Sequence, residues 1–86
     1  MTEKKLTIQH PSGLHARPAS LLVQEASKFE SKITLVKAGK EVDAKSLLGV
    51  MSLAVKQGDE ITIRAEGADA EQAVSALVER LENLGE

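Results

Sequence analysis

Hydrophobic and polar residues alternate with a period of two in four short segments of the chain, a pattern that is typical of strands with one buried face. The residues that we expect to face the core in these segments are, in chain order, Leu6 and Ile8, then Ile33 and Leu35, then Val42, and last Ile61, Ile63 and Ala65. The pair Ala38-Gly39 between the second and third segments predicts a tight hairpin turn. The sequence therefore predicts four strands, of which the middle two form a hairpin.

Between the predicted strands, apolar residues recur at the three- and four-residue spacings of a helix face. These residues are Ala16, Ala19, Leu22, Val23 and Ala26 in the first helix, Leu47, Val50, Met51 and Ala54 in the second, shorter helix, and Ala70, Ala73, Val74, Leu77, Val78, Leu81 and Leu84 in the third. Asp69 and Gln72 stand at the spacing of a capping box at the start of the third helix, and Gly85 is expected to end it.

The predicted elements follow in the order β-α-β-β-α-β-α, and every strand alternates, so one face of the sheet is expected to be exposed to water. The other face then takes all three helices. We therefore predict an α/β (α+β) fold, an open-faced two-layer sandwich of a four-stranded antiparallel sheet with three helices on one face. With 86 residues, the chain has room for a single domain, residues 1–86, with one small core.

The composition excludes several classes of function. The chain has no Cys, which excludes disulfides, zinc ribbons, iron–sulfur clusters and thiol catalysis. The small core leaves no room for an enclosed cofactor cavity, so we expect no cofactor. His10 and His15 lie five residues apart without a neighbouring carboxylate, which is a poor metal site, and we expect no bound metal. Because the sequence has neither a signal peptide nor a long apolar run, we expect a cytoplasmic protein with no membrane insertion.

Charged residues are unevenly distributed along the chain, although the net charge is only −2. Residues 1–56 carry nine Lys and Arg against five Asp and Glu, whereas residues 57–86 carry two Arg against eight Asp and Glu. This asymmetry leaves two interpretations, ordinary solvated charge or a basic face that steers an acidic partner. The acidic balance and the lack of aromatic stacking residues indicate no direct nucleic-acid partner.

His15 is the strongest candidate for chemistry, because we expect it at the N-cap of the first helix. Gly13 gives the preceding loop backbone freedom, and Pro18 suits the first helical turn. The unpaired N–H groups of Ala16 and Arg17, together with the Arg17 guanidinium, are suited to binding phosphoryl oxygens. The residues around His15 include no Asp, Glu or Cys to act as an acid–base partner, which favours a covalent carrier over a hydrolase. A helix-capping His beside a solvent-exposed Arg is the alternative.

The run Gly13–Ala19 (GLHARPA) resembles the active-site signature of HPr, the histidine-containing phosphocarrier of the bacterial sugar phosphotransferase system. The resemblance extends to the length, the order of elements and the closing acidic helix. It implies that Enzyme I, charged by phosphoenolpyruvate, phosphorylates Nδ1 of His15, and that the phosphoryl group passes to the IIA component of a sugar transporter. It also implies that Arg17 is the cation that stabilises the phosphate. Ser12 is expected either to add a hydroxyl near the phosphate or to cap a turn.

Ser46 is expected at the N-cap of the second helix, where Ser is a favoured residue. The segment Lys45–Leu53 (KSLLGVMSL) resembles the regulatory-serine segment of HPr from Gram-positive bacteria, in which an ATP-dependent HPr kinase/phosphorylase modifies the Ser. The family more often has Ile and Met where this chain has Leu47 and Leu48, which questions partner affinity more than phosphorylation. The resemblance implies that phosphorylated Ser46 weakens docking to Enzyme I and recruits a catabolite control protein, a transcription repressor of carbon catabolite repression. A purely structural cap is the alternative.

Leu47, Leu48 and Met51 give the second helix more apolar residues than one buried stripe needs. Those that stay exposed would form a partner-docking patch together with Leu14. Packing of the same residues in the core is the alternative.

The leading hypothesis is thus a phosphocarrier that is not an enzyme and that works as a monomer. Its implied partners are Enzyme I, IIA components, the Ser kinase and the catabolite control protein. A regulatory binding module with little sugar phosphotransfer is the alternative, although relatives of that kind typically replace the acceptor His, which this chain retains as His15. A nitrogen-branch phosphocarrier is a third hypothesis, which the Ser46 segment disfavours. A metal chaperone would need paired Cys, and a self-standing enzyme would need a base, a metal site or a cavity.

Overall fold

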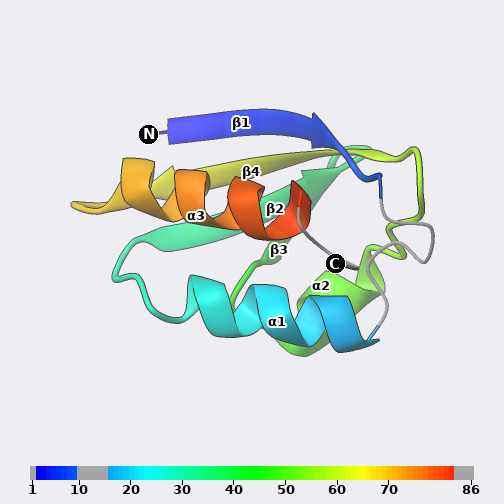
Figure 1. Ribbon diagram of the computed structural model, residues 1–86, viewed down its shortest axis with the longest axis horizontal. Helices are drawn as coiled ribbons and strands as arrows, with labels where there is room; N and C mark the ends of the chain where they lie inside the picture. Colours follow the sequence, from blue (N-terminus) through cyan, green and yellow to red (C-terminus); the bar gives the residue numbers. More distant parts are fainter. Residues whose placement is uncertain (1, 10–15, 83–86) are drawn as a thin grey trace.

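Within the part of the chain that the structure describes, seven secondary-structure elements follow one another in the order that the sequence predicts (Figure 1). The computed structural model describes residues 2–9 and 16–82, with residues 16–18 described by their backbone alone. The strands are β1 (Thr2–Thr7), β2 (Lys32–Lys37), β3 (Lys40–Asp43) and β4 (Glu60–Glu66), and the helices are α1 (Ala16–Ala26), α2 (Leu47–Ser52) and α3 (Ala70–Glu82). The predicted fold class is confirmed, whereas the predictions for Leu84 and Gly85 lie outside the described residues.

The four strands form one antiparallel sheet with the order β1-β4-β2-β3. β4 lies between β1 and β2, so that Ile63 of β4 is paired with Lys4 on one side and with Leu35 on the other. The predicted inward residues of the two central strands are all fully buried, namely Ile33, Leu35, Ile61, Ile63 and Ala65. The period-two pattern therefore predicted the buried face of the sheet correctly.

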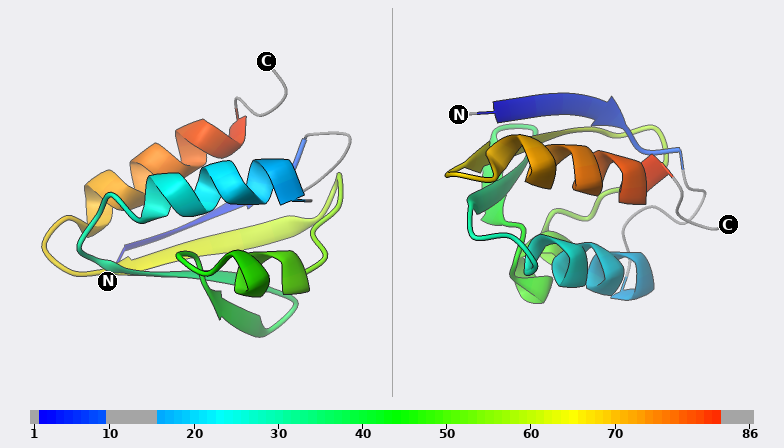
Figure 2. Two further views of the ribbon diagram at one scale, coloured as in Figure 1. Left: turned by 90° about the horizontal axis from the view of Figure 1, so that it is seen from below. Right: turned by 60° about the vertical axis from the view of Figure 1, so that its left-hand side comes forward.

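The three helices cover one face of this sheet, and no described element covers the other (Figure 2). α1 contacts both of the other helices, with α3 on one side and α2 on the other. The helical residues buried between the layers are Ala19, Leu22 and Ala26 of α1, Val50 of α2, and Ala70, Ala73, Val74, Leu77 and Leu81 of α3. Val23 and Val78 pack half-buried against this core. The stripes predicted for the first and third helices are confirmed for the side chains that the structure describes.

The turn between β2 and β3 consists of Ala38 and Gly39 alone, since Lys37 pairs directly with Lys40. Both turn residues have positive φ angles, 51° for Ala38 and 84° for Gly39. Two consecutive positive φ angles define the two-residue turn whose twist matches that of a hairpin. The predicted tight turn is confirmed.

The apolar residues that predicted the second helix are divided between the core and the surface. Val50 is fully buried, but Leu47 and Met51 are 39% and 40% exposed, and Ala54 lies beyond the end of α2 with a φ of 50°. A helix of six residues is too short to bury a stripe that spans eight. Leu53, directly after the helix, is buried instead and supplies the apolar contact that periodicity assigned to the helix.

Asp69 precedes α3 as predicted, and its carbonyl accepts a hydrogen bond from the Ala73 N–H at 2.9 Å. Its carboxylate does not form the predicted capping box with Gln72. It accepts instead from the N–H groups of Glu30 and Ser31, both at 2.9 Å, and from the Ser31 hydroxyl. The Ser31 hydroxyl and the Glu30 N–H lower the pKa of Asp69. The side chain thus joins two loops that are far apart in the sequence.

Candidate functional site

The predicted phosphate site lies at the start of α1. Helix α1 begins at Ala16, which is where the sequence predicts a helix with His15 as its N-cap. Ala16 and Arg17 are its first two residues, and N–H groups in the first turn of a helix lack acceptors within the helix. Together with the helix dipole, such groups favour a bound anion. The predictions for Ser12, Leu14 and His15 themselves lie outside the described residues.

The chain that leads toward the predicted site is held by the turn before β4. The Ile8 N–H donates to the Asp59 carbonyl at 2.9 Å, and the Gly58 N–H donates back to the Ile8 carbonyl at 2.8 Å. The side-chain amide of Gln57 donates to the Gln9 carbonyl at 3.2 Å. Gln9 is the last described residue before the segment that carries His15 in the sequence. One short turn therefore fixes the backbone from which that segment departs.

Ser46 lies at the N-cap of α2, as predicted. Its backbone is extended, with φ −109° and ψ 116°, and its hydroxyl accepts a hydrogen bond from the Gly49 N–H at 3.1 Å. Its carbonyl accepts the first helical bond, from the Val50 N–H at 2.9 Å. The hydroxyl is half-buried and stabilises the helix N-terminus, which is the geometry that N-cap Ser residues adopt. Its role as a phosphorylation site stays a prediction.

Lys45 ties the start of α2 to the end of α1. Its ammonium donates to the Phe29 carbonyl at 2.7 Å, in the turn that follows α1. Its backbone N–H donates to the Asp43 carboxylate at 2.8 Å, and the Ser46 N–H donates to the Asp43 carbonyl at 3.0 Å. The position of Ser46 is therefore fixed from both sides.

The large apolar side chains that stay exposed within the described residues all lie on the neighbouring helices α1 and α2. Leu48 is 83% exposed, and Met51, Leu21 and Leu47 are each about 40% exposed. We call these four residues the α1–α2 apolar surface. Exposure of Leu47, Leu48 and Met51 agrees with the docking interpretation rather than with core packing, and the role of Leu14 lies outside the described residues.

Leu21 was not among the predicted docking residues. Leu21 and Leu22 are adjacent in α1, and two adjacent residues of a helix point about 100° apart. Only Leu22 lies on the predicted core stripe, and it is fully buried. Two adjacent leucines in a predicted helix therefore indicate that one of them remains at the surface.

Ion pairs connect the basic part of the sequence to the acidic part. The pairs that join residues 1–56 to residues 57–86 are Lys37–Asp59, Glu3–Arg64, Glu41–Arg64 and Glu25–Arg80. The Arg80 hydrogen bond is also the main cause of a lowered pKa at Glu25. Only Lys37–Asp59 joins a base of residues 1–56 to an acid of residues 57–86, whereas the other three pairs join acids of residues 1–56 to Arg64 and Arg80. The ion pairs therefore bring the two parts of the sequence together in space without cancelling the charge asymmetry.

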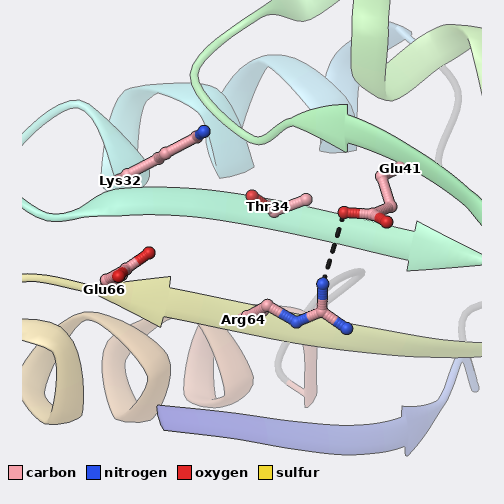
Figure 3. A pocket seen from close by; sticks show the side chains of 5 residues that line it. All are labelled: Lys32, Thr34, Glu41, Arg64 and Glu66. Atoms are coloured by element: carbon pink, nitrogen blue, oxygen red, sulfur yellow. Dashed lines mark hydrogen bonds and ion pairs between the residues drawn. The ribbon is translucent and has the colours of Figure 1, made fainter. Parts of the chain in front are cut away.

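The open face of the sheet has a shallow hollow of about 150 Å³ (Figure 3). It is lined by Lys32, Thr34, Glu41, Arg64 and Glu66. Within it, Arg64 donates from Nη1 to Glu41 at 3.2 Å and from Nε to Glu3 at 3.1 Å. Because two carboxylates already neutralise this guanidinium, the hollow is poorly suited to a phosphate, and the start of α1 remains the candidate site.

The described part of the chain has neither a cluster of metal ligands nor a helix suited to a membrane. Residues 2–9 and 16–82 contain no group of three or more His, Asp or Glu side chains placed to share a metal ion. None of the three described helices combines the length and the apolar character that crossing a membrane requires.

Comparison with known proteins gives consistent matches. A family model described as the PTS HPr component phosphorylation site matches residues 2–83. The HPr-like protein Crh of Halalkalibacterium halodurans is 48% identical over 82 residues, which cover 95% of this chain and 98% of that protein. The crystal structure of HPr-C-His from Thermoanaerobacter tengcongensis has a TM-score of 0.93 at 51% identity and covers 95% of this chain and 92% of its own. Crh of Bacillus subtilis, described as a domain-swapped dimer, has a TM-score of 0.77 at 45% identity and covers 95% and 94% of the two chains.

These matches extend over both layers of the fold and over the start of α1 and of α2. They cover nearly the whole of this chain and of its relatives at about half identity. The chain therefore belongs to the HPr family of the phosphotransferase system, a family of phosphocarriers.

Proposed function

We propose that this chain accepts a phosphoryl group on His15 from Enzyme I that phosphoenolpyruvate has charged, and passes it to the IIA components of sugar transporters. The observation that carries the proposal is the family match over residues 2–83, which includes the run Gly13–Ala19 with its His and Arg. The start of α1 at Ala16 supports it, because the residue before a helix is well placed to present a phosphoryl group to the helix N-terminus.

The chemistry that we propose is a simple transfer. The lone pair of Nδ1 in the neutral His15 ring forms a bond to phosphorus, while the bond from phosphorus to Enzyme I breaks. The Arg17 guanidinium and the first-turn N–H groups of α1 then neutralise the phosphoryl oxygens. In the second step, the bond from phosphorus to Nδ1 of His15 breaks while a bond to the IIA component forms. The carrier thereby returns to its original state.

A second candidate function is a regulatory binding module that uses its phosphoserine form and transfers little phosphoryl group to transporters. The similarity to the HPr-like protein Crh favours it, at 48% identity. The presence of a His and an Arg in the run Gly13–Ala19 favours the carrier.

A phosphorylation assay separates the two functions. The chain is incubated with phosphoenolpyruvate and Enzyme I, and the product is examined by intact mass and by ³¹P NMR. One acid-labile phosphoryl group is the expected result for the carrier. No labelling under these conditions, together with acid-stable labelling of Ser46 by HPr kinase and ATP, would establish the regulatory module instead.

We further propose that Ser46 is the regulatory phosphorylation site, which links the chain to the HPr kinase/phosphorylase and to the catabolite control protein. Its N-cap position supports this, because a phosphate adds about −1.5 to −2 charges and is favourable at the start of a helix. The modification is therefore expected to change the charge of the α2 region without unfolding it. Charge alone then weakens docking to an acidic surface of Enzyme I.

Replacing Ser46 by Asp is expected to raise the KM of Enzyme I for this chain, and the increase should shrink as the salt concentration rises from 0.05 to 0.5 M. Screening reduces an interaction between exposed charges at high ionic strength. Ser46→Asn is the matched control, because Asn caps a helix as well as Asp but carries no charge. A loss of coupling that is equal for both variants, or independent of salt, would point to a changed conformation.

We propose that the α1–α2 apolar surface, with Leu14, is the surface that docks on Enzyme I and on the other partners. A few well-packed residues near the centre of an interface usually carry most of its binding energy. Replacing Leu48 by Ser is expected to raise the KM for Enzyme I about five- to tenfold, while the midpoint of urea unfolding stays nearly unchanged because the side chain is 83% exposed. Leu48→Met keeps an apolar side chain and should retain most of the affinity. Equal KM values for the wild type and Leu48→Ser would remove Leu48 from the docking surface.

We retain the monomer as the proposed working state of the carrier. In support, the described residues of one copy form a four-stranded sheet with a buried core. The domain-swapped dimer described for Crh of Bacillus subtilis is the competing arrangement within the family.

A further inference from the structure

The ammonium group of Lys37, at the end of β2, has oxygen acceptors on two different segments. It donates to the carbonyls of Leu53 and Ala54, both at 3.0 Å, and lies 2.9 Å from the Asp59 carboxylate. A lysine ammonium has three N–H donors, so all three have acceptors here. The side chain is 23% exposed, which limits competition from water.

Lys37 is well placed to donate hydrogen bonds to carbonyl groups at the end of α2. The last carbonyls of a helix lack donors within the helix, and the helix dipole makes this end negative. The chain then turns at Ala54, whose positive φ is unusual for a residue other than glycine. Lys40, on the same hairpin, donates to the Ser52 carbonyl at 3.3 Å. Two lysines of the hairpin therefore stabilise the end of α2, but only Lys37 also reaches Asp59.

Asp59 connects this lysine to the turn before β4. Its carboxylate also accepts from the Lys56 N–H at 2.8 Å, and its own N–H donates to the Lys56 carbonyl at 3.0 Å. The Lys37 ammonium first, and the Lys56 N–H second, lower the pKa of Asp59. The carboxylate is therefore charged at neutral pH, and this contribution is lost only as the pH falls through the lowered pKa.

The same turn holds the backbone that leads toward His15. The Asp59 carbonyl accepts from Ile8, the Gly58 N–H donates to Ile8, and the Gln57 amide donates to Gln9. A continuous series of direct contacts thus runs from the end of α2, through Lys37 and Asp59, to Ile8 and Gln9.

We infer that Lys37 is a positioning residue for phosphoryl transfer, which fixes the departure of the His15 segment by holding Asp59 and the end of α2 together. This inference rests on the proposed function of His15. It assigns Lys37 no contact with the phosphoryl group. Lys37 narrows the range of positions from which His15 meets Enzyme I. This effect acts on the rate of the transfer step rather than on the affinity of docking.

The test compares Lys37→Met with Lys40→Met. Both variants remove a lysine of the same hairpin that donates to the end of α2, but only Lys37→Met removes the link to Asp59. Asp59→Asn removes the charge of the link from its other end. Lys37→Arg keeps a cation that can still reach a carboxylate and is the variant expected to restore function.

Two readouts are measured on the intact chain. The first is independent of activity and consists of hydrogen exchange at the Ile8 amide and of the NMR signals of the His15 ring, assigned in a His10→Gln background. The second is the kcat and KM of Enzyme I for each variant.

Lys37→Met is expected to speed exchange at Ile8 about tenfold, as the loss of one hydrogen bond to a charged group would, and to shift the His15 signals. It should lower kcat about fivefold with little change in KM, which is the signature of a lost positioning effect. Asp59→Asn should act in the same direction, whereas Lys40→Met should match the wild type.

Equal effects of Lys37→Met and Lys40→Met would overturn the inference, because they would show that the lysines act only on α2. Unchanged Ile8 exchange and His15 signals in both Lys37→Met and Asp59→Asn would overturn it as well. Failure of the wild-type chain to accept a phosphoryl group would instead overturn the proposed function. The exchange and ring signals would then still decide whether Lys37 positions the His15 segment.

Discussion

Replacing His15 by Ala is expected to abolish phosphoryl acceptance from Enzyme I entirely. The covalent bond to phosphorus needs a nucleophilic nitrogen, and the run Gly13–Ala19 offers no other side chain that forms one at neutral pH. The measurement is the intact mass of the chain after incubation with Enzyme I and phosphoenolpyruvate. His10→Ala is the matched control, because it removes the other histidine of the chain and should leave labelling unchanged.

The loss at His15 should be chemical rather than structural. Because we expect His15 at the N-cap of α1, its replacement should lower the free energy of unfolding by only about 1 kcal/mol, the usual cost of a lost N-cap residue. Urea unfolding followed by circular dichroism therefore accompanies the labelling assay. Persistent labelling of His15→Ala would remove His15 from the mechanism, and labelling that disappears in His10→Ala alone would transfer the role to His10.

Replacing Gly67 by Ala is expected to cause a large loss of stability, about 2–4 kcal/mol, from backbone strain and overpacking together. Gly67 has a φ of 147°, which side chains rarely tolerate. A Cβ atom there would lie 2.6 Å from the Ser31 hydroxyl and 2.9 Å from the Ser31 Cα atom. Ser31 cannot easily move aside, because it is 2% exposed and is held by the Asp69 carboxylate. Since a domain of 86 residues is stabilised by only about 4–13 kcal/mol, such a loss should lower the urea midpoint of the variant markedly.

Gly39→Ala is the matched control for this prediction. Gly39 also has a positive φ, 84°, but a Cβ atom there would have no neighbour within 4 Å. Its cost is therefore the conformational penalty alone, about 1–2 kcal/mol. Urea unfolding of both variants gives the comparison. Equal losses in the two variants would show that the approach of Gly67 to Ser31 does not constrain the fold.

The pattern of apolar residues predicted the fold well in elements with one face fully in the core and the other in water. The inward residues of β2 and β4 and the long stripe of α3 belong to this class. Prediction was less successful at α2, because a helix of six residues depends on contacts from outside it, here from Lys37 and Lys40. The partner acceptors of these lysines are backbone carbonyls more than ten residues away, which no pattern of residue types can reveal.

The candidate site was predicted by a different route. The residues alone placed a His and an Arg at the start of a helix and favoured a covalent carrier over a hydrolase, but they left a plain capping role open. The resemblance of the run Gly13–Ala19 then implied the phosphoryl donor and acceptor proteins. The N-cap of Ser46 followed from local preference, since its acceptor geometry involves only its own helix. The capping box at Asp69 failed because Ser31 and Glu30, distant in the sequence, compete for the same carboxylate.

The order of the sheet also bears on how the protein is made. β1 leaves the ribosome before the other strands of this sheet, but its neighbour in the sheet is β4, residues Glu60–Glu66. The turn that holds Ile8 and Gln9 precedes β4 directly and is likewise translated late. Because a contact cannot form before both of its partners exist, β1 must wait without its partner while α1, the hairpin and α2 are translated. β1, which leads to the proposed phosphoryl acceptor, is thus translated before the rest of the sheet and is among the last of its elements to be anchored.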